Sequence, residues 1–287
     1  MSKIKTYYSL TKPGVLYGNA LTTVAGFLLA SNGVINWWSF IAVTIGSTLI
    51  IASACVLNNF LDQDIDQKMA RTKKRALVQK EIPGWHAVVF SVVLGLVGLA
   101  ILIAWTNWLV VWVGVSGFVV YVWLYGALSK RLSMHGTLVG SVSGAAPILA
   151  GYVAVTNTID IGAVLVFIIL FIWQMPEFYS IAVYRMKEYK AAGVPVISVV
   201  RGIPETKIQI FIYTILFVIS TLLLTVYDIT NYTYAVVMGV LGLYWLWIGA
   251  QGLKKESGDA WARKMFRFSL IILLAFCFLI SIDAWLP

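Results

Sequence analysis

Three side chains that bind cations well recur one helical turn apart near position 60. They are Asn58, Asp62 and Asp66, which fall within roughly 80° of arc on a helix that turns about 100° per residue. Asp64, between the two acids, is expected to point the opposite way. Two carboxylates one turn apart repel each other by about 0.2–0.5 kcal/mol even when exposed. The spacing therefore predicts that a cation lies between Asp62 and Asp66.

The residues downstream suggest which cation this is. Basic side chains follow directly, so a solvated acidic helix end neutralised by its own lysines and arginines is one interpretation. A divalent metal is the other, and Mg²⁺ prefers carboxylates together with the phosphate oxygens of a substrate. Asp62, Asp66 and Mg²⁺ on one side, with Arg71 and Arg75 on the other, would hold a diphosphate. We favour the metal, because ionisable residues at membrane depth are typically functional.

A second group of candidates lies about 120 residues later. If one helix continues past Pro176, then Glu177, Tyr184 and Glu188 fall within about 40° of one another and face the interior together. Glu177 is then close to membrane depth, where an unpaired carboxylate is costly. We expect Glu188 to join the site around Asp62 at the same membrane face.

Membrane helices must position both groups, because 60% of the 287 residues are hydrophobic and only 11% are charged. A soluble domain carries about 25% charged residues. At about 20 residues per helical span, the apolar runs predict an all-α polytopic protein in which residues 1–287 form a single domain. The runs are continuous, which excludes the alternating strands of a membrane β-barrel. Nine spans are predicted, at residues 14–31, 38–61, 85–105, 108–127, 136–155, 161–182, 208–227, 232–250 and 268–286.

The basic residues indicate how these spans are oriented. All 21 lysines and arginines fall in the N-terminal segment and in the segments after the second, fourth, sixth and eighth predicted spans. Cytoplasmic loops carry this excess of positive charge. We therefore expect a multi-pass protein of the cell (plasma) membrane, with its N-terminus in the cytoplasm and its C-terminus outside. The net charge of +9 follows from topology and attraction to anionic lipids, so no nucleic-acid partner is expected.

Two further kinds of feature are not expected. Cys55 and Cys277 both lie inside apolar runs, which argues against a disulfide framework or a cysteine metal site. Lys3, Lys5 and Lys12 precede an apolar stretch without a small-residue cleavage site, so the first span is expected to stay in the mature protein.

Together these motifs resemble the intramembrane (UbiA-type) prenyltransferases. Asn58-x-x-x-Asp62-x-x-x-Asp66, followed by Met69-x-Arg71-Thr72-x-x-Arg75, is similar to the first signature of that family. Their order and spacing along nearly the whole chain most resemble the branch that farnesylates protohaem IX. The other matching segments are Thr11-Lys12-Pro13-Gly14, Gly117-Phe118-Val119-Val120-Tyr121, Lys130-Arg131, Ser143-Gly144-Ala145-Ala146-Pro147, Trp173-Gln174-Met175-Pro176 and Tyr189-x-x-Ala192-Gly193-x-Pro195.

The resemblance implies nine helices around a central cavity open to the cytoplasmic side, with Mg²⁺ as cofactor. Asn58, Asp62 and Asp66 correspond to the residues that hold Mg²⁺ and the prenyl diphosphate in that family, and Glu188 corresponds to the acid of its second motif. The metal ligands implied are therefore Asp62, Asp66 and Glu188.

The resemblance also implies the reaction and its partners. A farnesyl group passes from farnesyl diphosphate to a vinyl group of protohaem IX (haem B), and water captures the resulting cation. The product is expected to pass to a haem A synthase or a terminal oxidase.

Several residues are candidates for binding these substrates. Arg71 and Arg75 would stabilise the leaving diphosphate. Aromatic faces favour a carbocation by about 0.5–2 kcal/mol, and we nominate Tyr121 and Tyr184 for this role. Lys130, Arg131 and Arg185 are candidates for the haem propionates or the diphosphate, although basic residues that only touch lipid headgroups are as good an interpretation.

Two positions depart from the family pattern. Glu177 stands where the family usually has His, and Glu188 stands where it usually has Asp. The longer Glu188 side chain can still reach a metal, whereas the first change removes a candidate ligand for haem iron. His86 and His135 are the remaining imidazoles. A hydrogen bond at the membrane interface is the preferred interpretation of each, so no iron ligand is assigned.

Two other functions fit part of the sequence. A sister enzyme that prenylates an aromatic quinone precursor or another tetrapyrrole would share the metal site and differ in its acceptor pocket. A membrane transporter would also place carboxylates within the bilayer. The acids here cluster at one face without a convincing internal repeat, which argues against transport.

Overall fold

The computed structural model describes residues 3–254 and 257–286, and within these ranges the regular elements are all helices. Nine of the described helical segments are long and apolar enough to cross a membrane. The all-α architecture with nine spans is therefore confirmed. These segments are α2 (Pro13–Ser31), α3 (Trp37–Leu61), α5 (Gly84–Trp105), α6 (Trp108–Val119) with its continuation, α8 (Gly136–Thr156), α9 (Ile161–Tyr184), α12 (Gly202–Val226), α13 (Tyr232–Gly252) and α14 (Asp259–Ile282).

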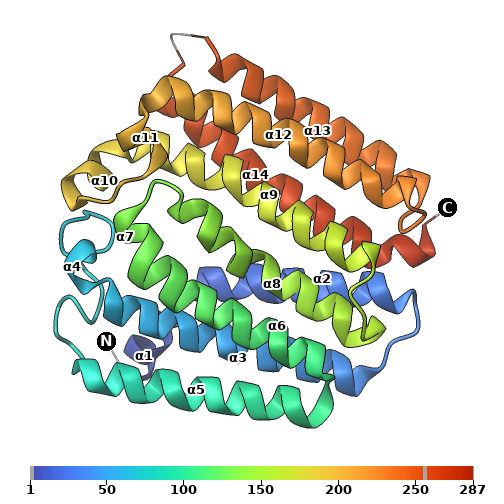
Figure 1. The fold of residues 1–287 in the computed structure, drawn as a ribbon, viewed down its shortest axis with the longest axis horizontal. Coiled ribbons are helices and arrows are strands. Elements are labelled where there is room, and N and C mark those ends of the chain that lie inside the picture. The colour runs from blue at the N-terminus through green and yellow to red at the C-terminus, as the bar shows by residue number, and fades with distance from the viewer. Residues whose placement is uncertain (1–2, 255–256, 287) are drawn as a thin grey trace.

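Short helices gather at one end of the bundle, which we call the loop end. Figure 1 shows the N-terminus at this end and the C-terminus at the other, as an odd number of crossings requires. The short elements there are α1 (Lys3–Leu10), α4 (Gln63–Asp66), α7 (Lys130–Leu132), α10 (Met186–Ala192) and α11 (Ile197–Val200).

The opposite end consists of tight connections between capped helices. The side-chain oxygens of Asn36, Asn107 and Asp160 accept hydrogen bonds from backbone N–H groups three residues later, at 3.2, 3.1 and 2.9 Å. Each bond satisfies an N–H group that a helix start leaves without a partner. These caps explain why α3, α6 and α9 begin where their apolar runs begin.

Three spans extend further than their apolar runs predict. The helices α12 and α14 begin at Gly202 and Asp259, whereas residues 208 and 268 were expected. The fourth span continues as a π-helix, Val120–Ser129, and then as α7 to Leu132. Hydropathy detects only the part that lies in hydrocarbon, so the expected limits were too short where a helix continues with charged residues toward water.

The helices α2 and α8 pack closely against each other. A Cβ on Gly26 would lie 2.1 Å from the Ile148 carbonyl oxygen, and one on Gly151 would lie 2.0 Å from that of Thr23. Each glycine therefore allows one helix backbone to touch the other. Small residues serve this purpose in membrane helix pairs, where lipid removes the hydrophobic drive for association.

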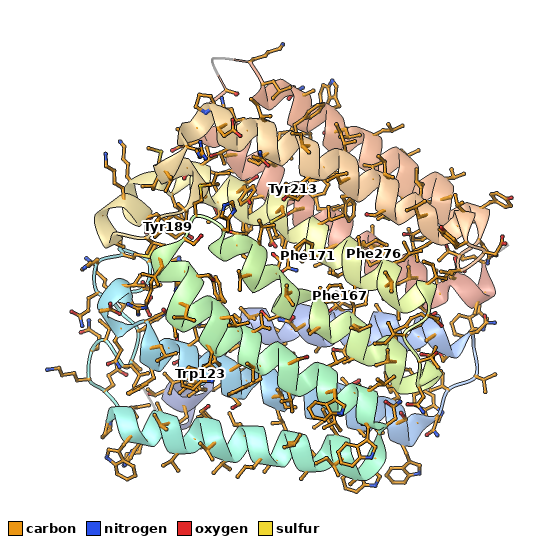
Figure 2. All side chains as sticks on the ribbon, in the orientation of Figure 1. Trp123, Phe167, Phe171, Tyr189, Tyr213 and Phe276 are labelled. Atoms are coloured by element: carbon orange, nitrogen blue, oxygen red, sulfur yellow. The ribbon has the colours of Figure 1, made fainter. Side chains whose placement is uncertain are left out.

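The bundle is apolar both inside and outside. Phe276 is 1% exposed inside the bundle, whereas Trp123 on the π-helix is 57% exposed (Figure 2). Large exposed apolar side chains also cover α5 and α13. Such a surface is suited to lipid, and this chain is a multi-pass membrane protein.

Candidate active site

A cavity of about 700 Å³ enters the bundle at the loop end. Its walls come from α2, α3, α6, the π-helix, α8, α9 and α14, with the α4 region at the mouth. Charged side chains line the mouth, and mostly apolar and aromatic side chains line the interior. The cavity thus joins a site for a charged group to a chamber for an apolar one.

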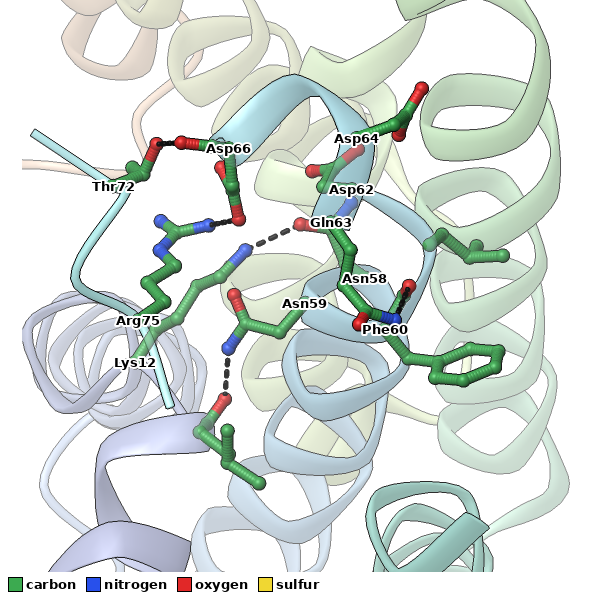
Figure 3. Close-up of polar contacts among 12 residues, drawn as sticks. Lys12, Asn58, Asn59, Phe60, Asp62, Gln63, Asp64, Asp66, Thr72 and Arg75 are labelled. Carbon is green, nitrogen blue, oxygen red and sulfur yellow. Dashed lines mark hydrogen bonds and ion pairs between the residues drawn. The ribbon is translucent and has the colours of Figure 1, made fainter. Parts of the chain in front are cut away.

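Each buried carboxylate at the mouth has a basic partner. Asp62 accepts a hydrogen bond from Lys130 Nζ at 2.5 Å. Asp66 accepts one from Arg75 at 2.6 Å, as Figure 3 shows. Asp62 is 1% exposed and Asp66 is 3% exposed. All four residues line the cavity. An ion pair of this kind survives burial only when geometry and hydrogen bonding are good.

The two acids are not on one helix. Asp62 is the last residue of the turn that ends α3, with φ −88° and ψ 6°, and α4 begins at Gln63. The expectation of a continuous helix through Asp66 is therefore wrong, because the chain turns at Asp62. The two carboxylates still face the same cavity.

The donor set fits a magnesium ion. Among the described residues, no group of three or more His, Cys, Asp and Glu side chains has the geometry of a metal site. Magnesium needs fewer protein ligands, because it keeps several waters and binds one or two carboxylates together with substrate phosphates. Asp62 Oδ1 is buried with no hydrogen-bond donor. That oxygen, with the Asp66 carboxylate on the same cavity wall, suits a hard cation.

Lys12 is a member of this site that the motifs near position 60 did not reveal. It adopts a left-handed backbone conformation, with φ 53°, immediately before α2. Its Nζ donates a hydrogen bond to Asn58 Oδ1 (Figure 3), and both residues line the cavity. Burial disfavours the charged ammonium and lowers the pKa of Lys12 to about 8. The sequence signals for Lys12 were its place before the first span and the segment Thr11-Lys12-Pro13-Gly14, which matches the family pattern but does not indicate a contact with Asn58.

Arg131 lies beside Asp62 and pairs mainly with Asp64. It donates two hydrogen bonds to Asp64, at 2.7 and 2.8 Å, and one to the Leu61 carbonyl oxygen at 2.7 Å. The neighbouring guanidinium lowers the pKa of Asp64 to about 2. Arg131 is not among the residues that line the cavity. Its contact with substrate stays a prediction. Because one nitrogen of Arg131, Nη2, lies 2.8 Å from Asp64 Oδ1 and 3.9 Å from Asp62 Oδ1, the two acids meet the same guanidinium group, and the expectation that Asp64 points the opposite way from Asp62 is not confirmed.

The second predicted group is only partly assembled. The helix α9 passes through Pro176, and Glu177 and Tyr184 both line the cavity. It then ends at Tyr184, and a turn at Arg185 leads into α10, which carries Glu188. The prediction that Glu177, Tyr184 and Glu188 share one helix is therefore wrong, because Glu188 lies on α10.

Glu188 and Arg185 form an ion pair at the loop end. Arg185 donates to Glu188 Oε1 at 2.8 Å, while Oε2 is buried without a donor. Arg185 lines the cavity, but Glu188 does not. Participation of Glu188 in the metal site stays a prediction.

The remaining candidates divide between mouth and interior. Arg71 is exposed and lines the mouth, and Tyr121 projects from the π-helix into the cavity. Tyr184 already has Arg263 over its ring at 4.5 Å and Arg185 at 5.5 Å. Its ring therefore stacks with guanidinium groups as the structure stands, which leaves Tyr121 as the stronger aromatic candidate.

Neither histidine lines the main cavity. The His86 ring nitrogen Nδ1 is 3.1 Å from the Tyr7 hydroxyl, the kind of interfacial hydrogen bond expected for it. His135 is exposed and lines a smaller cavity of about 460 Å³ between α8, α9 and α12.

A comparison with protein families assigns this architecture. The model of the UbiA prenyltransferase family matches residues 19–271. The chain belongs to the UbiA prenyltransferase family. It is therefore an intramembrane prenyltransferase, and the transport alternative has no support.

Individual relatives agree with this membership. The protoheme IX farnesyltransferase of Edwardsiella ictaluri is 44% identical over 280 residues, which cover 98% of this chain and 95% of that protein. The protein of the same name from Serratia proteamaculans is 45% identical with the same coverage.

Solved structures share the fold of this UbiA prenyltransferase. A digeranylgeranylglyceryl phosphate synthase superimposes with a TM-score of 0.82 over 99% of both chains, at 21% identity. A UbiA homologue from Archaeoglobus fulgidus, bound to DMAPP and Mg²⁺, gives a TM-score of 0.71 at 15% identity, over 96% of this chain and 99% of that one.

Proposed function

We propose that this prenyltransferase uses Mg²⁺ to transfer a farnesyl group from farnesyl diphosphate to a vinyl group of protohaem IX, giving haem O. The observation that carries the proposal is one cavity with paired acids and bases at its mouth and an apolar chamber behind them. The mouth suits a diphosphate and the chamber suits a prenyl chain. The acceptor is suggested by relatives 44–45% identical over nearly the full length, which are named for protoheme IX.

The leaving group is held at the mouth. Asp62 and Asp66 would hold Mg²⁺. Glu188, which also lies at the loop end, is the third acid proposed for the metal. When bound, the ion supplies positive charge against the charge that grows on the diphosphate. Lys130 and Arg75 now neutralise the two aspartates. With the ion bound, Lys130 and Arg75 would be free to donate hydrogen bonds to the diphosphate.

Other polar residues at the mouth complete the binding of the diphosphate. Arg71 and Arg185 line it, and Lys12 fixes the Asn58 side chain while adding a further basic group. Asn58 Nδ2 is buried without an acceptor, so it can donate to a phosphate oxygen. Donors placed before the reaction cost no reorganisation when charge develops.

The apolar chamber protects the reactive group. Departure of diphosphate leaves positive charge on the first carbon of the farnesyl chain, and water would capture it. Apolar and aromatic side chains, including Tyr121, line the chamber and exclude bulk water. A cation there is also favoured by about 0.5–2 kcal/mol over an aromatic face.

The acceptor supplies the electrons for the new bond. The π electrons of the vinyl group bond to the farnesyl carbon, and water then adds to the cation next to the ring. The haem keeps its oxidation state. The product carries a hydroxyethylfarnesyl side chain.

Orientation in the cell follows from charge. We propose that the loop end faces the cytoplasm and that the protein lies in the plasma membrane, because every lysine and arginine flanks that side. Delivery of the product to a haem A synthase or a terminal oxidase stays a prediction.

Acceptor competition tests the proposal. Purified protein in lipid nanodiscs receives Mg²⁺, farnesyl diphosphate and either haem B or 4-hydroxybenzoate, and products are identified by mass spectrometry. We expect haem B to gain one farnesyl group and one hydroxyl. A prenylated benzoate, with haem B unchanged, would instead support the quinone-precursor alternative.

A further inference from the structure

Glu177 is a buried acid that the steps above do not use. It is 8% exposed and lines the main cavity. None of the described residues donates a hydrogen bond to its carboxyl group or forms an ion pair with it. A buried, unpaired carboxyl group costs several kcal/mol by the usual order of magnitude. The presence of such a costly group in the wall of the cavity indicates a chemical role.

The acid lies deeper than the charged mouth. Glu177 lies eight positions before Arg185, the residue that follows the end of α9, which corresponds to a rise of about 12 Å. The other charged side chains that line the cavity all belong to the loop end, namely Lys12, Asp62, Asp66, Arg71, Arg75, Lys130 and Arg185. Glu177 is therefore the carboxyl group beside the chamber rather than beside the diphosphate.

Its neighbours leave the carboxyl group free for a ligand. Gln174 lies one turn earlier on the same face. Its amide nitrogen donates hydrogen bonds to the carbonyl oxygens of Ser141 and Leu170, at 3.1 and 2.9 Å, and not to Glu177. Phe178 and Ile181 add apolar surface to the same wall. A carboxylate in such surroundings attracts a carbocation more strongly than it would in water.

The proposed reaction needs a base in this chamber. The farnesyl C–O bond breaks as the vinyl electrons form a C–C bond, which leaves positive charge on the vinyl carbon next to the ring. Water forms a C–O bond there, and one of its protons must leave. The diphosphate is held at the mouth, away from this step.

We propose that Glu177 is the general base that holds this water and accepts its proton. The inference rests on the proposed function. Water capture gives an alcohol, whereas loss of a proton from the neighbouring carbon gives an alkene lighter by one water. Glu177 thus decides which product forms.

The test compares porphyrin products by liquid chromatography and mass spectrometry. Wild type, Glu177→Gln and Glu177→Asp react with Mg²⁺, farnesyl diphosphate and haem B in nanodiscs, with melting temperatures as a folding check. Glu205→Gln is the matched control, because Glu205 lines only the smaller cavity and its carboxylate already accepts from Gln209 at 3.2 Å. General base catalysis contributes about 10²–10⁴-fold.

We expect Glu177→Gln to form the alcohol about 10²–10⁴-fold more slowly, with a larger fraction of alkene, and Glu177→Asp to be intermediate. Glu205→Gln should match wild type. If Glu177→Gln forms the alcohol at the wild-type rate and with the wild-type ratio of alcohol to alkene, the role of Glu177 is overturned and the proposed function is not. If Glu177→Gln does not fold, a wild-type ratio in Glu177→Asp overturns it. Failure of wild type to convert haem B at all would overturn the proposed function and this inference together.

Discussion

At the scale of single residues, the site is organised by charge pairs that a substrate can exchange. Asp62 and Asp66 are both buried, and each is neutralised by a base that also lines the cavity. Removal of either partner leaves a buried charge uncompensated, which is costly. Binding of a metal and a diphosphate would replace each carboxylate–base pair by a carboxylate–metal and a phosphate–base contact.

Asp62→Ala should abolish prenyl transfer, because it removes a carboxylate that is expected to hold the metal. The loss should exceed about 10²-fold in kcat/KM, measured as diphosphate released per minute by purified protein. Asp64→Ala is the control, since Asp64 is exposed and bonded to Arg131 outside the cavity. Near-normal transfer by a folded Asp62→Ala variant would remove this residue from the metal site.

Lys12→Met should weaken substrate binding while the bundle stays folded. It removes the buried hydrogen bond to Asn58 and one basic group of the mouth. A hydrogen bond to a charged group contributes about 1.5–3 kcal/mol, so kcat/KM should fall by about 10–150-fold. Lys68→Met, which changes an exposed lysine, should leave it unchanged. Equal kinetics for the two variants would contradict a role for Lys12.

The sequence was informative about residues whose partners are local. The spacing of Asn58, Asp62 and Asp66 predicted a polar cluster, and both acids do line the cavity. Lys12 contacts Asn58 across 46 positions of the chain, a packing relation that no local pattern contains. Arg131 is held by Asp64, a pairing that the sequence pattern did not indicate, and its contact with substrate stays a prediction.

At the scale of elements, helix ends decide which side chains share the cavity. The turn at Asp62 and the turn at Arg185 each occur where the sequence suggested a continuous helix. Apolar length predicted the existence of every span, because lipid requires about 20 apolar residues. Apolar length could not place the first residues of α12 and α14, because both helices begin with charged segments that precede the apolar run.

Gly151→Ala should destabilise the bundle at the crossing of α2 and α8. The added Cβ would lie 2.0 Å from the backbone oxygen of Thr23, so a helix must shift. Overpacking of this kind costs about 1–3 kcal/mol, seen as a lower melting temperature in detergent. Gly18→Ala is the control, because its Cβ would meet nothing within 4 Å. A melting temperature as high as that of Gly18→Ala would show that the crossing is loose.

At the scale of the whole molecule, charge and shape agree. The short helices α1, α4, α7, α10 and α11 belong to the loop end (Figure 1). The charged side chains that line the cavity mouth come from the same end. From the odd number of spans among the described residues, we predict that the two ends of the described chain lie on opposite sides of the membrane. The charge pattern therefore predicts the side on which substrate enters.

Thiol labelling tests this orientation. Both native cysteines are buried, so single cysteines can be placed at two exposed sites, Lys190→Cys at the loop end and Thr158→Cys at the other. A membrane-impermeant maleimide added to intact spheroplasts should label Thr158→Cys, and should label Lys190→Cys only after lysis. The reverse pattern would place the cavity mouth outside the cytoplasm.

The most direct measurement is an experimental structure with a farnesyl thiodiphosphate analogue and Mn²⁺, located by its anomalous scattering. We predict the ion within about 2.0–2.3 Å of oxygens of Asp62 and Asp66, touching the diphosphate, with Lys130 and Arg75 moved onto phosphate oxygens. An analogue bound without an ion beside these carboxylates, or with Asp62 and Asp66 still paired to their bases, would contradict the account.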